Sequence, residues 1–224
     1  MGQERELKLD LTAAEAQRLV AQLPPPFARR EQRNHYLDSP AGELRRRQCG
    51  ARLRAEECGG ASRYTLTIKG PSHVQDGVAE RFEAQREIGA DEARQILSRG
   101  ASLGELQITL PPALTGLSGD TPLRLLGYSD NERCCYRLSL DGPAPHELQL
   151  ELDRTRYPDG SGTFELEVEE TGDARLPLAL LRAWLQAHGI GWHPSQSSKF
   201  ARFLARGGVP ESRISSWQGG KPVR

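Results

Sequence analysis

The feature of this sequence that most constrains its fold is a period-two alternation of charged and apolar residues, which recurs in seven separate segments. In the first, Glu4, Glu6 and Lys8 alternate with Leu7 and Leu9. The other segments are residues 51–54, 65–69, 81–85, 133–140, 147–153 and 164–169. Because successive side chains of a β-strand point to opposite faces, each segment predicts a strand with one charged and one apolar face.

The charged faces of these predicted strands differ from those of an ordinary surface sheet. Lysine and arginine gather on some strands, whereas glutamate and aspartate gather on others. A closed β-barrel explains this pattern if its apolar outer face packs under helices and its charged face lines a water-filled interior. Closure also leaves no strand edge exposed. A ladder of structural salt bridges is the alternative, but surface ion pairs contribute only about 0–1 kcal/mol each.

Helices are predicted from the spacing of apolar residues. The three predicted helices are residues 12–23, 91–98 and 178–188. Thr12 is a capping residue with Glu15 three positions later, and the prolines at 24–26 end the first helix. Residues 111–121 are rich in Gly, Pro, Ser and Thr and predict a loop that leads into a short helix. The fold class is therefore α+β and mainly β.

The composition of the chain excludes several classes of function. The chain of 224 residues has 30 Lys and Arg against 30 Asp and Glu, and this balance argues against a nucleic-acid partner. No run of about 18 apolar residues predicts a membrane span, and no signal peptide is apparent. The four cysteines suggest neither a disulfide framework nor a metal site, so a reduced, cytoplasmic location is expected. The spacing of the five histidines does not predict a metal site either. The sequence makes no prediction of the oligomeric state.

The predicted barrel interior holds both signs of charge. Its cations are Lys8, Arg52, Arg54, Lys69, Arg81, Arg133, Arg137 and Lys199. Its acids are Glu4, Glu6, Glu83, Glu151, Asp153, Glu165, Glu167 and Glu169. A triphosphate uses both, because guanidinium and ammonium groups bind its oxygens while carboxylates hold the Mg²⁺ or Mn²⁺ that bridges to it. The sequence therefore predicts a small-molecule triphosphate as the ligand.

The order of these segments resembles the CYTH, or triphosphate tunnel metalloenzyme, superfamily. Residues 4–8 match its ExExK strand, residues 36–40 its Y-[FL]-D-[TS]-P segment, and residues 44–54 its L-R-R…L-R-x-R strand. The remaining matches are L-T-x-K at 66–69, R-x-E at 81–83, Arg133, residues 150–153, E-x-E at 165–167 and the lysine segment at 198–201. Together these matches span residues 4–203.

The resemblance implies an eight-stranded antiparallel tunnel that is open at both ends and covers residues 1–204. The Gly, Ser and Pro content of residues 205–224 predicts a flexible tail. The resemblance also implies that Glu4, Glu6, Glu165 and Glu167 bind a divalent metal, and that Glu83 and Asp153 serve a second metal or its waters. It implies these phosphate ligands: Lys8, Arg52, Arg54, Lys69, Arg81, Arg133 and Lys199. We add Arg137 to that set from the strand alternation, and we expect this catalytic set: Glu4, Glu6, Lys8, Arg52, Arg54 and Glu167.

Two positions depart from the family pattern. Gln85 replaces a carboxylate of R-x-E-x-E, which puts a second metal in doubt, and Arg154 stands where relatives have Glu, with an expected outward orientation. The segments at 32–40, 152–169 and 198–203 favour a stand-alone triphosphatase that hydrolyses inorganic tripolyphosphate to pyrophosphate and phosphate. The alternatives are a thiamine triphosphatase, a class IV adenylyl cyclase and a non-enzymatic polyphosphate or nucleotide sensor.

Overall fold

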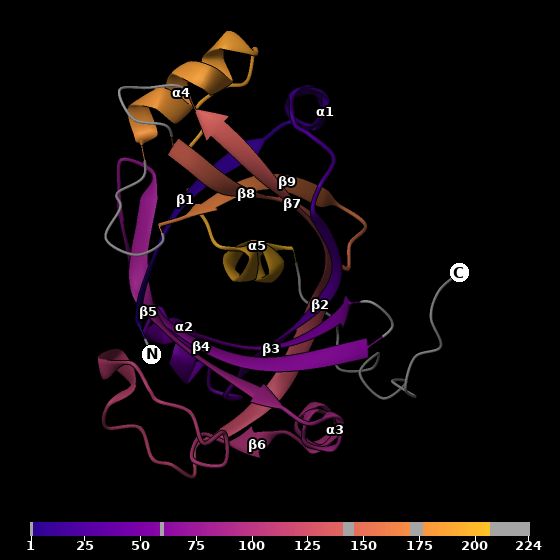
Figure 1. The fold of residues 1–224 in the computed structure, drawn as a ribbon. Coiled ribbons are helices and arrows are strands. Elements are labelled where there is room, and N and C mark those ends of the chain that lie inside the picture. The colour runs from indigo at the N-terminus through magenta and orange to yellow at the C-terminus, as the bar shows by residue number, and fades with distance from the viewer. Residues whose placement is uncertain (1, 59–60, 141–145, 171–176, 207–224) are drawn as a thin grey trace.

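A closed antiparallel β-barrel of eight strands forms the centre of the computed structural model, which describes residues 2–58, 61–140, 146–170 and 177–206 (Figure 1). The strands are β1 (Gly2–Leu11), β2 (Ala28–Asp38), β3 (Gly50–Cys58), β4 (Ala61–Gln75), β5 (Val78–Ile88), β6 (Ala101–Ser102), β7 (Pro122–Leu140), β8 (His146–Arg156) and β9 (Gly162–Glu169). The ring order is β2-β3-β4-β5-β1-β9-β8-β7, and pairing of β7 with β2 closes it. The short β6 pairs with β7 outside the ring.

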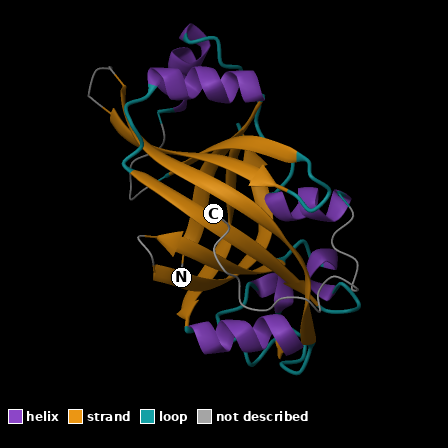
Figure 2. Ribbon diagram, turned by 90° about the vertical axis from the view of Figure 1, so that its right-hand side faces the viewer, coloured by secondary structure: helices purple, strands orange, loops and turns teal. Residues whose placement is uncertain are grey.

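The described residues also form helices, most of which pack on the outside of the barrel. They are α1 (Ala13–Gln22), α2 (Glu43–Arg46), α3 (Ala90–Arg99), the 3₁₀ turn η1 (Pro112–Leu114), α4 (Leu178–Ala187) and α5 (Lys199–Ala205). Helices α1 and α4 lie over β1, β9 and β8, whereas α3 and η1 lie over β3 and β4 on the opposite side (Figures 1 and 2). No helix of the described residues is both long and apolar enough to cross a membrane.

The apolar face of each strand points outward and packs under these helices. Leu7 and Leu9 of β1 pack with Leu19 of α1 and Leu181 of α4 in one core. A second core joins strand and helix residues in the same way and includes Leu53, Leu66, Ile68, Ile96, Leu97 and Leu114. Burying leucines on the outer face leaves the alternate, charged residues to face inward, as the period-two pattern predicted.

The three predicted helices are present with ends shifted by one residue at most. Thr12 and Glu15 form the predicted capping box of α1, in which each side chain binds the backbone N–H of the other residue. The predicted loop at 111–121 contains η1. Strand β2 was not among the alternating segments, because its last five residues are buried on both faces and leave no period-two signal.

Helix α5 lies across one end of the barrel. Its residues reach strands on different sides of the ring: Lys199 pairs with Asp153 of β8, Arg202 with Asp10 of β1, and Phe203 packs on Tyr36 of β2. Figure 1 shows α5 inside the ring of strands. The strands thus form the closed, tunnel-like barrel that was expected, with α5 at one of its ends. Of the tail predicted at 205–224, Ala205 ends α5 and residues 207–224 lie outside the described parts of the chain.

Candidate active site

A cavity of about 600 Å³ lies inside the barrel, between the strands and α5. Its walls differ in charge because of the ring order. Strands β2 and β3 stand opposite β1 and β9, with two strands between them on either side. Strands β1 and β9 bring glutamates to the cavity, whereas β3 brings Arg52 and Arg54. An anion bound between these walls would meet guanidinium groups on one side and carboxylates on the other.

The first carboxylate group consists of Glu4, Glu6 and Glu169, which we call the Glu4 group. One oxygen from each residue lies within 4.8 Å of the others. Arg81 donates hydrogen bonds to Glu4 at 2.6 Å and to Glu6 at 2.7 Å, but no described residue pairs with the Glu169 carboxylate. Partial desolvation of the Glu169 carboxylate and the neighbouring charges of Glu151, Glu6 and Glu4 raise its pKa, although the residue as a whole is exposed. This set fits a hard divalent cation, which takes oxygen ligands and would relieve the repulsion.

The second carboxylate group consists of Asp153, Glu165 and Glu167, which we call the Asp153 group. Its oxygens also lie within 4.8 Å of one another, and all three residues are buried. Cations already saturate it: Lys199 Nζ lies 2.9 Å from Asp153 and 2.6 Å from Glu167, and Arg133 contacts both. Although burial raises the pKa of Asp153, Lys199 and Arg133 lower it to about 2. In this structure the Asp153 group is therefore an ion-pair network, and the metal-binding role implied for Asp153, Glu165 and Glu167 stays a prediction.

Glu83 lies outside both carboxylate groups. Its carboxylate pairs with Lys69 Nζ and accepts a hydrogen bond from Gln85 Nε2. Burial opposes ionisation, but the charges of Lys69 and Arg52 and the hydrogen bonds with Glu4 and Lys69 together lower the pKa of Glu83 to about 2. In this structure Glu83 is thus the ion-pair partner of Lys69, and its implied role toward a second metal stays a prediction.

Arg52 and Arg54 form the unneutralised part of the cavity. Arg54 Nε donates to Asn34 Oδ1 at 3.0 Å, and Arg52 Nη2 donates to Thr67 Oγ1 at 3.4 Å. Among the described residues, no carboxylate lies within 4.0 Å of either guanidinium, and the Arg52 Nε is buried without a partner. Burial and the charges of Arg52 and Arg133 lower the pKa of Arg54 to about 9. Two partly buried cations without a carboxylate partner predict a bound anion.

Comparison with known proteins supports this interpretation. The CYTH domain model matches residues 2–204. The chain belongs to the CYTH family. No curated protein matches it, whereas a solved structure described as a putative adenylyl cyclase, HpAC1 from Hippeastrum, with a dominant triphosphatase activity, is 28% identical. It has a TM-score of 0.74, with 90% of this chain and 95% of that chain covered.

Two further solved structures share the fold. A putative adenylate cyclase from Bacillus halodurans is 22% identical, with a TM-score of 0.62 and coverage of 91% of this chain and 100% of that chain. PH1819 from Pyrococcus horikoshii is 18% identical, with a TM-score of 0.61 and coverage of 91% and 99%. At these identities the similarity shows the fold alone.

The cavity inside the barrel, which we call the CYTH cavity, brings together most of the predicted site residues. The predicted residues that line it are Glu4, Glu6, Lys8, Arg52, Arg54, Lys69, Arg81, Glu83, Arg133, Glu167 and Lys199. Glu165 and Asp153 lie just behind Lys199, with which both pair. Arg154 is exposed and points outward, as expected.

The position of Arg137 corrects one prediction. Its side chain is exposed, does not line the cavity and lies 5.2 Å from the ring centroid of Phe27. Strand β7 is 19 residues long and continues past the end of the cavity, so the inward phase of Arg137 falls beyond the enclosed space. Alternation identified the face of the strand but not how far the barrel extends along it.

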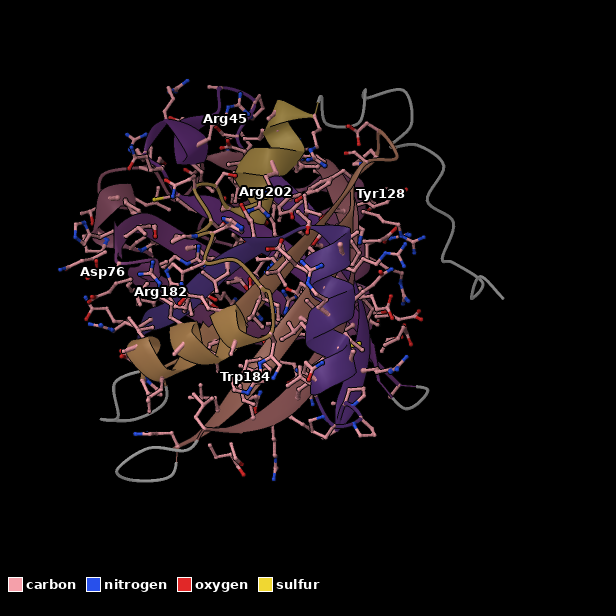
Figure 3. The ribbon with its side chains drawn as sticks, turned by 90° about the horizontal axis from the view of Figure 1, so that it is seen from above. Arg45, Asp76, Tyr128, Arg182, Trp184 and Arg202 are labelled. Carbon is pink, nitrogen blue, oxygen red and sulfur yellow. The ribbon has the colours of Figure 1, made fainter. Side chains whose placement is uncertain are left out.

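Other cavity residues were not predicted as site residues. Glu169 completes the Glu4 group. The alternation pattern had placed it inside the barrel, but it was not predicted as a metal ligand. Asn34 does not itself line the cavity but accepts a hydrogen bond from Arg54. Arg45 of α2 lines the cavity, and Figure 3 shows it beside α5. Tyr36 and Phe200 stack with ring centroids 5.1 Å apart and form an aromatic part of the wall. Tyr36 and Arg45 lie in segments that resemble the family pattern, at 36–40 and 44–54, and this resemblance could have identified them as cavity residues.

Proposed function

We propose that this CYTH domain is a metal-dependent phosphoanhydride hydrolase whose preferred reaction converts inorganic tripolyphosphate to pyrophosphate and phosphate. The observation that carries the proposal is the pair of unneutralised cations, Arg52 and Arg54, facing the Glu4 group across the cavity. A triphosphate needs both kinds of wall, since its oxygens bind guanidinium groups directly and reach carboxylates only through a cation.

The Glu4 group supplies the ligands for the Mg²⁺ or Mn²⁺ ion. A divalent ion held there would neutralise phosphoryl charge and polarise the bond that breaks. Arg52 and Arg54 hold the phosphate chain in place from the opposite wall. Lys69 and Arg81 stand beside Glu4 and add positive charge where the two walls meet. Phosphoryl transfer depends mainly on this positioning and charge stabilisation.

Hydrolysis requires a water molecule in line with the bond that breaks. The water oxygen bonds to the terminal phosphorus, the bridging P–O bond breaks, and pyrophosphate leaves with its electron pair. The water releases one proton to solvent or to a cavity carboxylate. Glu167 of the Asp153 group forms ion pairs with both Lys8 and Lys199. These ion pairs hold the Lys8 ammonium beside the substrate.

The similarity to HpAC1, whose description names a dominant triphosphatase activity, favours hydrolysis over cyclisation. That description also names an adenylyl cyclase, so formation of cyclic AMP from ATP is the second candidate. A sensor that binds a triphosphate without turnover is the third candidate, because Gln85 stands where the family pattern has a carboxylate. The Gln85 side chain donates a hydrogen bond to Glu83.

One experiment separates the three candidates. The purified protein is incubated with tripolyphosphate, thiamine triphosphate or ATP, each with Mg²⁺ or Mn²⁺, and orthophosphate, pyrophosphate and cyclic AMP are measured. Orthophosphate released fastest from tripolyphosphate supports the proposal. Cyclic AMP with pyrophosphate supports the cyclase, and tight binding without product supports the sensor.

A further inference from the structure

Arg45 lines the CYTH cavity although it belongs to no predicted site set. We propose that Arg45 is a further substrate-binding residue, which binds the phosphate farthest from the Glu4 group, and that Asp38 positions it. The inference rests on the proposed triphosphate ligand, and it names the residue that selects for an anionic group at the far end of the bound molecule.

The place of Arg45 in the fold is the first part of the argument. Helix α2 joins β2 to β3, which are the strands opposite β1 and β9 in the ring. Strand β3 carries Arg54 and Arg52, and Arg45 lies in α2, which precedes this strand in the chain. The cationic wall therefore extends past Arg52 to the end of the cavity at α5, whereas the Glu4 group lies on the opposite wall.

The backbone of α2 is fixed by residues at the end of β2. Asp38 is completely buried, and its carboxylate accepts hydrogen bonds from the N–H groups of Ser39 at 2.8 Å and Leu44 at 2.9 Å. Ser39 Oγ accepts another from the N–H of Glu43 at 2.9 Å. These contacts replace the side-chain cap that Gly42, at the N-cap, does not have. Because the Leu44 side chain is also buried in the core, the direction in which the Arg45 side chain leaves the helix is fixed.

Asp38 also holds the Arg45 side chain itself. Arg45 Nη1 lies 3.5 Å from Asp38 Oδ2, and 42% of the Arg45 side chain is exposed. A long, half-exposed ion pair is weak and leaves most of the five guanidinium N–H donors free. Phosphate oxygens are acceptors that match this fork. Asp38 therefore directs the guanidinium toward the cavity without occupying it.

Gly42 provides the space for the guanidinium. A Cβ at this position would lie 2.5 Å from Nε, Cζ and Nη2 of Arg45, so the guanidinium lies directly over the glycine. Gly42 also has a φ of 71°, which favours glycine.

The two neighbouring arginines differ from Arg45. Neither Arg46 nor Arg47 lines the cavity, and their guanidinium groups donate to the backbone oxygens of Ala41 and Glu43. Arg46 is exposed on the same helical turn and carries the same charge. It is the matched control for Arg45.

The test compares Arg45→Gln, Arg45→Lys and Arg46→Gln with the wild type. Initial rates with tripolyphosphate give kcat and KM, and titration calorimetry gives Kd for its non-hydrolysable imido analogue, both with Mg²⁺ present. Arg45→Gln is expected to raise KM and Kd about tenfold while kcat changes less than about threefold. Arg45→Lys is expected to recover part of the loss, and Arg46→Gln to stay within about twofold of wild type.

Asp38→Asn tests the positioning role, because its Oδ1 can still accept from the N–H groups of Ser39 and Leu44. The charged Oδ2, which faces both the N–H and the guanidinium of Arg45, is removed. Asp38→Asn is expected to raise KM, and the double variant with Arg45→Gln should be no worse than Arg45→Gln alone. Thermal unfolding of each variant separates this result from loss of fold. If the double variant shows the product of the two single effects, Asp38 does not act through Arg45.

The inference is overturned if Arg45→Gln resembles Arg46→Gln, or if it lowers kcat without changing KM and Kd. Failure of the proposed function looks different. In that case the wild type hydrolyses no triphosphate, and binding of the analogue, weakened by Arg45→Gln, still supports the role of Arg45. If the analogue does not bind the wild type, both proposals fail.

Discussion

Lys8 Nζ donates a 2.7 Å hydrogen bond to Glu167 Oε1 and lies 3.1 Å from Glu6 Oε1. It therefore touches the Asp153 group and the Glu4 group at once. Because one ammonium is shared, a change of charge in either carboxylate group alters the field in the other. The two groups nevertheless differ in their cation partners, and this difference makes them separable by mutation.

Glu6→Gln is expected to lower kcat for tripolyphosphate by about a hundredfold or more, because it removes a charged oxygen ligand from the Glu4 group. Arg81 and Lys8 lose one ion-pair partner each but keep others, so the fold should survive. Initial rates and thermal unfolding check both points. Glu80→Gln, which removes a half-exposed partner of Arg5, is the control and should leave kcat unchanged. Metal-dependent turnover that persists in Glu6→Gln would show that the assigned metal site is wrong.

Glu169→Gln and Glu165→Gln should separate the two carboxylate groups. We expect Glu169→Gln to weaken binding of Mg²⁺ or Mn²⁺ about tenfold to a hundredfold, because the Glu169 carboxylate has no cation partner among the described residues and is free to bind the ion. Glu165→Gln should instead lower the unfolding temperature, since Lys199 and Arg202 lose a buried partner. Metal titration calorimetry and thermal unfolding provide the readouts. The reverse pattern would place the metal at the Asp153 group.

Arg52→Gln is expected to weaken binding of tripolyphosphate about tenfold or more without lowering the unfolding temperature of the free protein. The physical reason is that Arg52 is largely enclosed and has no carboxylate partner, so removing its charge relieves a desolvation cost. Ligand-induced shifts in unfolding temperature measure both quantities in one experiment. Arg63→Gln, on the exposed part of β4, is the control. Destabilisation of the free protein by Arg52→Gln would contradict the absence of a counter-ion.

Affinity for tripolyphosphate should fall as the pH rises through about 8. Burial, together with the charge of Arg81, lowers the pKa of Lys69 from 10.5 to about 8, and only the protonated amine attracts phosphate. Lys69→Arg should keep its charge and move this loss of affinity to higher pH. Kd values for the imido analogue between pH 6.5 and 9.5 check the prediction. An unchanged profile in Lys69→Arg would assign the titration to another group.

Acid stability depends on Glu83. Its folded pKa of about 2 lies below the ordinary 4.5, so its contribution is fully present above pH 4.5 and is lost as the pH falls toward 2. Urea unfolding between pH 2 and 6 should give a shallower dependence of the unfolding free energy on pH in Glu83→Gln than in the wild type. Glu87→Gln, in an exposed pair with Arg63, is the control. Equal slopes in Glu83→Gln and the wild type would exclude Glu83 as a source of acid lability.

The sequence by itself determined the barrel, its polar interior and the three longer helices. Strand alternation is a local property: once Leu7 and Leu9 pack outward, Glu6 and Lys8 must face inward. Short elements left weaker signals, so α2 and α5, with 4 and 7 residues, were not predicted as helices.

Only the tertiary structure decided which charges meet. Register and barrel closure place Glu169 with Glu4 but Glu165 with Asp153, although Glu165 and Glu169 share one face of β9. The same closure leaves Arg52 without a counter-ion and Arg137 beyond the cavity. Alternation fixes the face of a side chain but not its height in the barrel or its neighbour across the ring, because both depend on strand stagger and on where α5 inserts.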